Sequence, residues 1–155
     1  MGKKRYNDLE LSIQQEAILM DYEKIREYRN ANNPYTQRQG IVVEEIRQGY
    51  ARVVKTVGPE DVNPLNIPHG GVYFTMADNA CGSAMAAYGT MAVTVDASYH
   101  FLRSAKIGDT LTAEAQEIKS GRTICIMEAR IFDQNQTLLG TGAFTFYRLD
   151  KPLPI

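Results

Sequence analysis

One long stretch without proline, between Pro68 and Gly89, most constrains how this chain can fold. Pro68 keeps the residue before it out of the helical region, and mostly good helix formers follow the Gly70-Gly71 pair. The stretch predicts a single long helix from about Gly71 to Tyr88. Its apolar residues cover nearly the whole circumference: Val72, Phe74, Met76, Ala77, Ala80, Cys81, Ala84, Met85 and Ala87. A helix of this kind, too short and too polar to span a membrane, must be buried in protein.

Short strand-like runs make up most of the remaining chain. Two precede the helix and four follow it: Ile41–Arg47, Tyr50–Val57, Met91–Leu102, Thr110–Ile118, Thr123–Phe132 and Thr137–Tyr147. Turn signals separate the runs after the helix, and such short connections favour antiparallel neighbours. The predicted fold class is therefore α+β, with a curved antiparallel sheet of five or six strands wrapped around the central helix.

The third of these runs alternates in a way that predicts its two faces. One face is expected to carry Val93, Val95, Ala97, Tyr99 and Phe101. The other face is expected to carry Thr94, Asp96, Ser98 and His100.

Chain length and composition indicate a single main domain, since 155 residues with 44% hydrophobic content suffice for one core. The predicted boundaries are a helical extension over 1–40, the main domain over 41–149 and a tail over 150–155. In the extension, Ser12 and Gln15 resemble a capping box, and apolar residues then recur at helical spacing to about Arg29. We expect this amphipathic helix to lie outside the domain and cover a sheet edge.

The charge balance and the rare residue types exclude several classes of protein. Seventeen basic and eighteen acidic side chains nearly cancel, and no basic run is interleaved with aromatic residues, which argues against a nucleic-acid partner. The first residues lack the apolar run of a signal peptide, so we expect a cytoplasmic protein with no membrane association. Cys81 and Cys125 are isolated and there are two histidines, which favours reduced core thiols and no metal site.

Asp78 is the most anomalous residue, because it interrupts an otherwise apolar helix and a buried carboxylate must be paired, hydrogen-bonded or protonated. A local hydroxyl or amide would be the ordinary explanation. The same helix, however, starts with Gly70-Gly71, whose backbone amides lie at the positive end of the helix dipole and offer an oxyanion site. A carboxylate combined with an oxyanion site indicates acyl transfer.

The spacing of Gly70 and Asp78 indicates that two chains share each site. Eight residues of helix place them roughly 12 Å apart, too far for both to act on one carbonyl group. If two such helices ran antiparallel across a two-fold axis, Asp78 of one would face Gly70 of the other. The sequence therefore predicts an obligate homodimer.

One motif reads Asn63-x-x-Asn66-x-x-His69-Gly70-Gly71, and Asp78 lies nine residues after its histidine. Two further segments follow, Val93-Thr94-Val95-Asp96 and the stretch 101–109. This combination closely resembles the hotdog-fold acyl-CoA thioesterases of the phenylacetate-pathway (PaaI) and THEM2 type, over about Ile41 to Tyr147. The resemblance implies a hotdog fold, hydrolysis of an acyl-CoA substrate, no cofactor and no metal. It also implies a homotetramer built as a dimer of dimers. Asn66 departs from the family, where glycine is usual.

Carried over residue by residue, the resemblance implies that Asp78 is the nucleophile or general base and that the Gly70 amide polarises the thioester carbonyl. Asn63 would orient the attacking water or the thioester, His69 would hold the turn and support Asn63, and Thr94 would bond the water or the carboxylate. For His69, a structural role as a helix cap is equally expected. The candidate substrate-binding residues, including cations for CoA phosphates, are Gly71, Arg103, Ser104, Lys106 and Arg122.

Two alternative functions remain open at this stage. Asp61-Val62-Asn63-Pro64-Leu65 resembles the start of the motif of hotdog enoyl-CoA hydratases, but Asn66 replaces the histidine of their acid–base pair. A non-catalytic acyl-CoA binding domain is the other alternative, although such a domain would not require Asp78.

Overall fold

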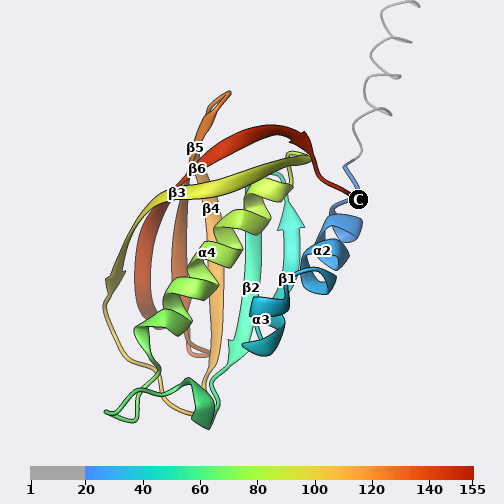
Figure 1. Ribbon diagram of the computed structural model, residues 1–155. Helices are drawn as coiled ribbons and strands as arrows, with labels where there is room; N and C mark the ends of the chain where they lie inside the picture. Colours follow the sequence, from blue (N-terminus) through green and yellow to red (C-terminus); the bar gives the residue numbers. More distant parts are fainter. Residues whose placement is uncertain (1–19) are drawn as a thin grey trace, which may run out of the picture.

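A six-stranded antiparallel sheet wraps around one long helix in the computed structural model, which describes residues 20–155 (Figure 1). The strands are β1 (Val42–Arg47), β2 (Tyr50–Thr56), β3 (Thr90–Phe101), β4 (Thr110–Ser120), β5 (Ile124–Phe132) and β6 (Leu138–Pro152). Their order across the sheet is β1-β2-β4-β5-β6-β3, so β1 and β3 form the two edges. The helices are α2 (Tyr22–Ala31), α3 (Pro34–Arg38) and α4 (Gly70–Ala86), with a 3-10 turn at Pro59–Asp61. The predicted hotdog architecture is confirmed.

The central helix α4 contacts all six strands across the hollow of the sheet. Its buried side chains pack against large residues from the strands, including Leu111, Met127, Ile131 and Phe144. Burial is not complete, however, because one stripe stays uncovered at helical spacing: Gly71, Phe74, Thr75, Asp78 and Gly82. The expectation of a helix buried all round is therefore corrected, since Phe74 is 40% exposed and Asp78 is partly exposed.

A β-bulge in β3 overturns the predicted alternation of that strand. Thr94 pairs with Phe146 and Asp96 with Thr145, which leaves Val95 as an extra residue on β3. The extra residue reverses which side chains face inward. Because Phe146 points into the core, Thr94 faces α4, whereas Val93 lies on the outer face. The side chains from Ala97 onward follow the predicted faces.

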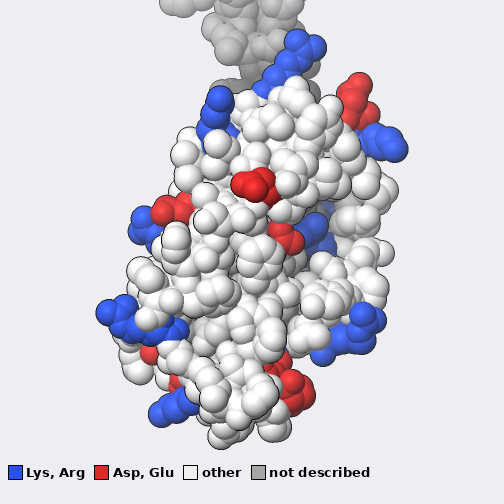
Figure 2. All heavy atoms as spheres, turned by 60° about the vertical axis from the view of Figure 1, so that its left-hand side comes forward, with Lys and Arg blue, Asp and Glu red and all other residues white. Residues whose placement is uncertain are grey.

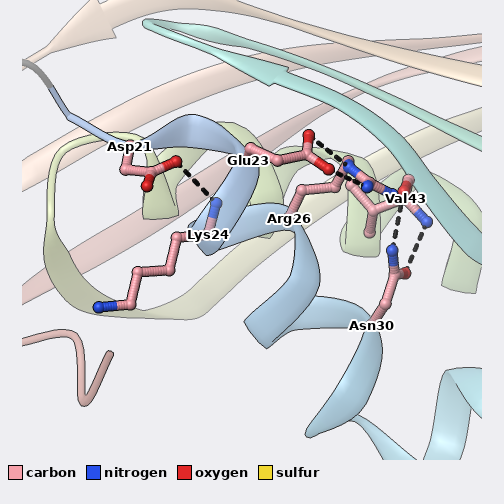
Figure 3. A network of polar contacts seen from close by, with 6 residues as sticks. All are labelled: Asp21, Glu23, Lys24, Arg26, Asn30 and Val43. Atoms are coloured by element: carbon pink, nitrogen blue, oxygen red, sulfur yellow. Dashed lines mark hydrogen bonds and ion pairs between the residues drawn. The ribbon is translucent and has the colours of Figure 1, made fainter.

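Helix α2 covers the free edge of β1, as expected for the described part of the N-terminal helix. Asp21 caps it by accepting from the Lys24 amide at 3.0 Å, and Asn30 exchanges two 2.9 Å hydrogen bonds with the backbone of Val43 (Figure 3). These two bonds satisfy an edge residue that has no neighbouring strand on that side. The predicted cap at Ser12 and Gln15 lies outside the described residues.

Two boundaries differ from the sequence expectation. After α2 the breaker around Pro34 starts the short helix α3, with Asn33 as its cap, instead of a loop. Strand β6 continues past the predicted end at Tyr147 as far as Pro152, because its last residues pair with Thr90 at the start of β3. The residues of the predicted tail from 150 to 152 therefore belong to the sheet.

Among residues 20–155, no helix has both the length and the apolar character needed to cross a membrane.

Candidate active site

Asp78 and Thr94 form a hydrogen-bonded pair between α4 and β3. The Thr94 hydroxyl donates to Asp78 Oδ1 at 2.7 Å, and the bulge in β3 is what turns Thr94 toward the helix. Both residues line a cavity of about 350 Å³. The Asp78 carboxylate is therefore held at one oxygen and open to a ligand in the cavity, which suits a nucleophile or general base.

Arg29 is a residue of this cavity that the sequence did not reveal. From α2 it donates to Asn79 Oδ1 at 3.0 Å and to Ser83 Oγ at 3.3 Å, both on α4. Burial lowers the pKa of Arg29, and the negative charge of the nearby Asp78 acts in the opposite direction. The N-terminal extension thus contributes a partly buried cation to the surroundings of the candidate catalytic carboxylate.

Asn63 belongs to a tight loop that precedes α4. Its side-chain oxygen accepts from the Leu65 amide at 2.9 Å and from the Ile67 amide at 3.4 Å, which folds the loop back on itself. Asn66 has a positive φ of 59° within this loop. That conformation favours glycine or asparagine, so Asn66 suits its place in the loop.

His69 caps the N-terminus of α4. Its Nδ1 accepts from the Gly71 amide at 2.8 Å, and its carbonyl oxygen accepts from the Val72 amide at 2.9 Å. Within the described residues, no hydrogen bond joins the His69 side chain to Asn63, so the structure places His69 in the capping role. The amide of Gly71 is used by this cap and is not free for a substrate.

The Gly70 amide, in contrast, has no hydrogen-bond partner within residues 20–155. It sits in the first turn of α4, where the helix dipole favours negative charge. A Cβ added at Gly70 would lie 3.2 Å from the Phe101 ring, a tight contact that the ring could relieve only by shifting. Gly70 therefore presents a backbone N–H that lacks a protein acceptor in the described part of the chain, at the positive end of the helix dipole.

The capping role of His69 can be tested by two substitutions. His69→Ala is expected to lower the free energy of unfolding by about 1 kcal/mol, because the Gly71 amide loses its acceptor. His69→Asn is expected to recover most of this loss, since asparagine is among the best N-cap residues. Urea unfolding of both variants checks this, and an Asn variant as unstable as the Ala variant would contradict the cap.

The other predicted binding residues fall into two places. Arg103 and Ser104 line a second cavity of about 300 Å³ together with Asn63 and Gly70, and Lys106 follows in the same loop. Arg122 lies in the β4–β5 turn, level with the start of β3 and away from the N-terminus of α4 (Figure 1). One protomer therefore brings Arg103 and Ser104, but not Arg122, to the Gly70 cavity.

The predicted catalytic residues fall into two groups, and each group lines a different cavity of one protomer. Asp78 and Thr94 belong to the first cavity, and Asn63 and Gly70 belong to the second. This separation agrees with the distance expected from the helical spacing of Gly70 and Asp78.

A buried ion pair supports the loop between these parts. Lys55 Nζ lies 2.8 Å from Asp61 Oδ2, and their side chains are 3% and 2% exposed. Asp61 also accepts from the Gly58 amide at 2.8 Å, and its carbonyl oxygen accepts from the His69 amide at 2.8 Å. Asp61, the acidic residue of the hydratase-like motif, is thus committed to holding the loop.

Cys81 and Cys125 are free thiols in the core, as predicted. Burial raises the pKa of Cys81, and the charge of Asp78 raises it further, so this thiol stays protonated. Within the described part of the chain, no group of three or more His, Cys, Asp or Glu side chains is placed to hold a metal ion.

Comparison with known proteins identifies the class to which this fold and site belong. Residues 65–139 match the family model of the thioesterase superfamily. Acyl-coenzyme A thioesterase PaaI of Escherichia coli is 33% identical over 105 residues, which cover 68% of this chain and 75% of that protein. The chain belongs to the thioesterase superfamily and, within it, to the hotdog-fold thioesterases of the PaaI type.

Solved structures give the same assignment. The E. coli PaaI protein, from the phenylacetic acid degradation operon, superposes with a TM-score of 0.82 at 27% identity, covering 84% of this chain and 95% of that chain. A Streptococcus mutans protein, smu.793, solved with acetyl CoA bound, gives a TM-score of 0.70 at 26% identity, covering 73% and 91%. The family resemblance and the enzyme class predicted from the sequence are confirmed.

Proposed function

We propose that the protein hydrolyses acyl-CoA to a free carboxylic acid and CoA, at sites shared between two subunits. The relatives that act on or bind acyl-CoA support the substrate class. The observation that carries the shared site is the separation of Asp78 and Gly70 into different cavities of one protomer. A second protomer, related by a two-fold axis, would bring its Asp78 to the Gly70 of the first.

Each group has a defined task in this proposal. The free Gly70 amide stabilises the negative charge that develops on the thioester oxygen. Asp78 either attacks the carbonyl carbon or takes a proton from the water that attacks it, and Thr94 fixes the orientation of the carboxylate. With water as the nucleophile, the C–S bond then breaks, the free acid forms, and the CoA thiolate leaves and takes up a proton. With Asp78 as the nucleophile, departure of the CoA thiolate leaves a mixed anhydride on Asp78, and a water molecule hydrolyses it to the free acid and the regenerated carboxylate. Arg103, Ser104 and Lys106 lie near Gly70, where they would bind the CoA portion.

The edge strand β3 supports the dimer. This strand and the residue that follows it expose large apolar side chains that a monomer would leave in water: Met91, Val93, Val95, Phe101 and Leu102. Figure 2, which brings the β3 side of the molecule forward, shows mostly uncharged surface, with charged groups along its outline and a few near its middle. The free edge of β3 also has unpaired backbone groups, so antiparallel pairing of two β3 strands would satisfy them and align the two α4 helices. Pairing of two such dimers would give the tetramer implied by the family.

The hydratase alternative has less support. Its motif requires an acid–base pair, but Asp61 is neutralised by Lys55 and Asn66 cannot exchange a proton.

A thioester hydrolysis assay tests the proposed function. Purified protein is incubated with a panel of acyl-CoA esters, and released CoA is followed with a thiol reagent. Turnover above the uncatalysed rate is expected for at least one ester. Binding of the esters without CoA release from any of them would contradict the proposal and favour a binding domain. Sedimentation at micromolar concentration is expected to show a dimer or tetramer, and a monomer would contradict the shared site.

A further inference from the structure

Arg29 has binding capacity that its protein contacts do not use. Its two acceptors, Asn79 Oδ1 and Ser83 Oγ, are neutral, and it forms no ion pair within the described residues. The guanidinium packs against α4 at Gly82, where an added Cβ would lie 3.1 Å from Nη2. A desolvated cation in a protein normally has an anionic partner in contact. The Arg29 guanidinium can therefore bind an anion in the cavity.

Asn79 also lines the Asp78 cavity and positions the Arg29 guanidinium, which donates to Asn79 Oδ1 at 3.0 Å. The residue is 6% exposed, and its Nδ2 has no hydrogen-bond partner within the described part of the chain. Because that nitrogen has almost no accessible surface, a ligand in the cavity would meet the Arg29 guanidinium, and Asn79 acts by holding the guanidinium in place through Oδ1.

We propose that the Asp78 cavity receives the acyl group and that Arg29, positioned by Asn79, binds a carboxylate at its far end. The preferred substrates are then CoA thioesters of short dicarboxylic acids. This inference rests on the proposed acyl-CoA hydrolysis and specifies its substrate class.

The spacing along α4 sets the length of the acyl group. Arg29 packs at Gly82, four residues beyond Asp78, which corresponds to about 6 Å along the helix axis. An acyl group of glutaryl size spans that distance from a carbonyl carbon at Asp78 to a carboxylate at Arg29. The cavity volume of about 350 Å³ accommodates a group of this size.

The chemistry of the Arg29 guanidinium favours a carboxylate over a methyl end. Guanidinium and carboxylate groups match in shape and charge and form paired hydrogen bonds. A methyl end would instead leave the Arg29 cation without an anionic partner. Sites built from buried donors reject ligands that lack the matching acceptor much more strongly than apolar pockets reject an extra methylene.

The test compares two thioesters that have the same number of acyl carbons, glutaryl-CoA and pentanoyl-CoA. The measured quantity is the ratio of kcat/KM for glutaryl-CoA to kcat/KM for pentanoyl-CoA, after subtraction of the uncatalysed rates. The wild-type ratio is expected to be about ten or more. Arg29→Met is expected to lower this ratio by about tenfold or more, because the cation is removed.

Two further variants separate ligand binding from a structural role of Arg29. Asn79→Asp is nearly isosteric and places a carboxylate against the Arg29 guanidinium, so it is expected to lower the ratio about tenfold with Arg29 still present. Arg26→Met is the matched control, because Arg26 lies one turn earlier on α2 and bonds Glu23 at the surface. This control is expected to keep the wild-type ratio.

A wild-type ratio of one or less would overturn the inference while leaving the proposed hydrolysis intact. A ratio that neither Arg29→Met nor Asn79→Asp changes would overturn it as well. Hydrolysis of neither ester, nor of any other acyl-CoA, would contradict the proposed function and this inference with it.

Discussion

Asp78→Asn is expected to lower kcat for acyl-CoA hydrolysis by about a hundredfold or more. Asparagine keeps the size of the side chain and an oxygen that accepts from the Thr94 hydroxyl, now 2.7 Å away. The fold and the binding of acyl-CoA should therefore survive. The amide, however, can neither attack a thioester carbonyl nor take a proton from water. Steady-state CoA release gives kcat, and calorimetric titration with the ester gives the dissociation constant.

Asp150→Asn is the matched control for this substitution, because Asp150 is an exposed carboxylate near the end of β6. The control variant is expected to retain wild-type turnover. If Asp78→Asn also turned over substrate at nearly the wild-type rate, Asp78 would be a structural residue satisfied by Thr94.

Asp61→Asn is expected to lower the free energy of unfolding by about 3–5 kcal/mol. The substitution leaves the Lys55 ammonium buried without its counter-ion, since both side chains of the pair are almost inaccessible to solvent. It also weakens the acceptor for the Gly58 amide. Equilibrium unfolding in urea, with the slope checked for two-state behaviour, measures the loss.

An exposed ion pair provides the control for this second prediction. Glu45 pairs with Arg47 and Arg52 on β1 and β2, where the side chains are substantially exposed. Glu45→Gln is expected to cost about 0–1 kcal/mol. Equal losses of unfolding free energy for Asp61→Asn and Glu45→Gln would contradict the claim that the buried pair stabilises the fold more than the exposed pair does.

Most of the fold could be predicted because its signals are local. The proline-free apolar stretch predicted α4, and the turn signals predicted where one strand ends and the next begins along the chain. What the alternation of β3 could not predict is the bulge at Val95, which depends on pairing with β6. The extension of β6 to Pro152 likewise depends on Thr90, a partner far away in the sequence. Long-range pairing overrode the local pattern at both places.

The residues of the candidate site also differ in whether a local signal in the sequence predicts them. Asp78 is recognisable as a carboxylate in an apolar helix, and the Gly-Gly pair marks the start of that helix. Arg29 gave no such signal, because its position over α4 depends on how α2 docks against the sheet edge. A weak hint exists in α4, where Asn79, Gly82 and Ser83 form a small polar strip that an apolar core would not require.

The shared active site is the central claim, and a mixed-dimer experiment tests it most directly. Asn63 precedes α4 and lines the same cavity as Gly70 of its own chain. Asp78 would instead act in the site of the other chain. The homodimers of Asn63→Ala and of Asp78→Ala are therefore each expected to be nearly inactive. In a mixed dimer, one site carries both lesions and the other carries neither.

The two variants are co-expressed with different tags, and the presence of mixed dimers is verified by tandem purification. With random assembly, half of the dimers are mixed and half of their sites are intact. The account therefore predicts roughly a quarter of wild-type activity for the co-expressed population if the subunits act independently. Activity no higher than that of the two parental homodimers, with mixed dimers present, would show that each site is drawn from one chain and would contradict the account.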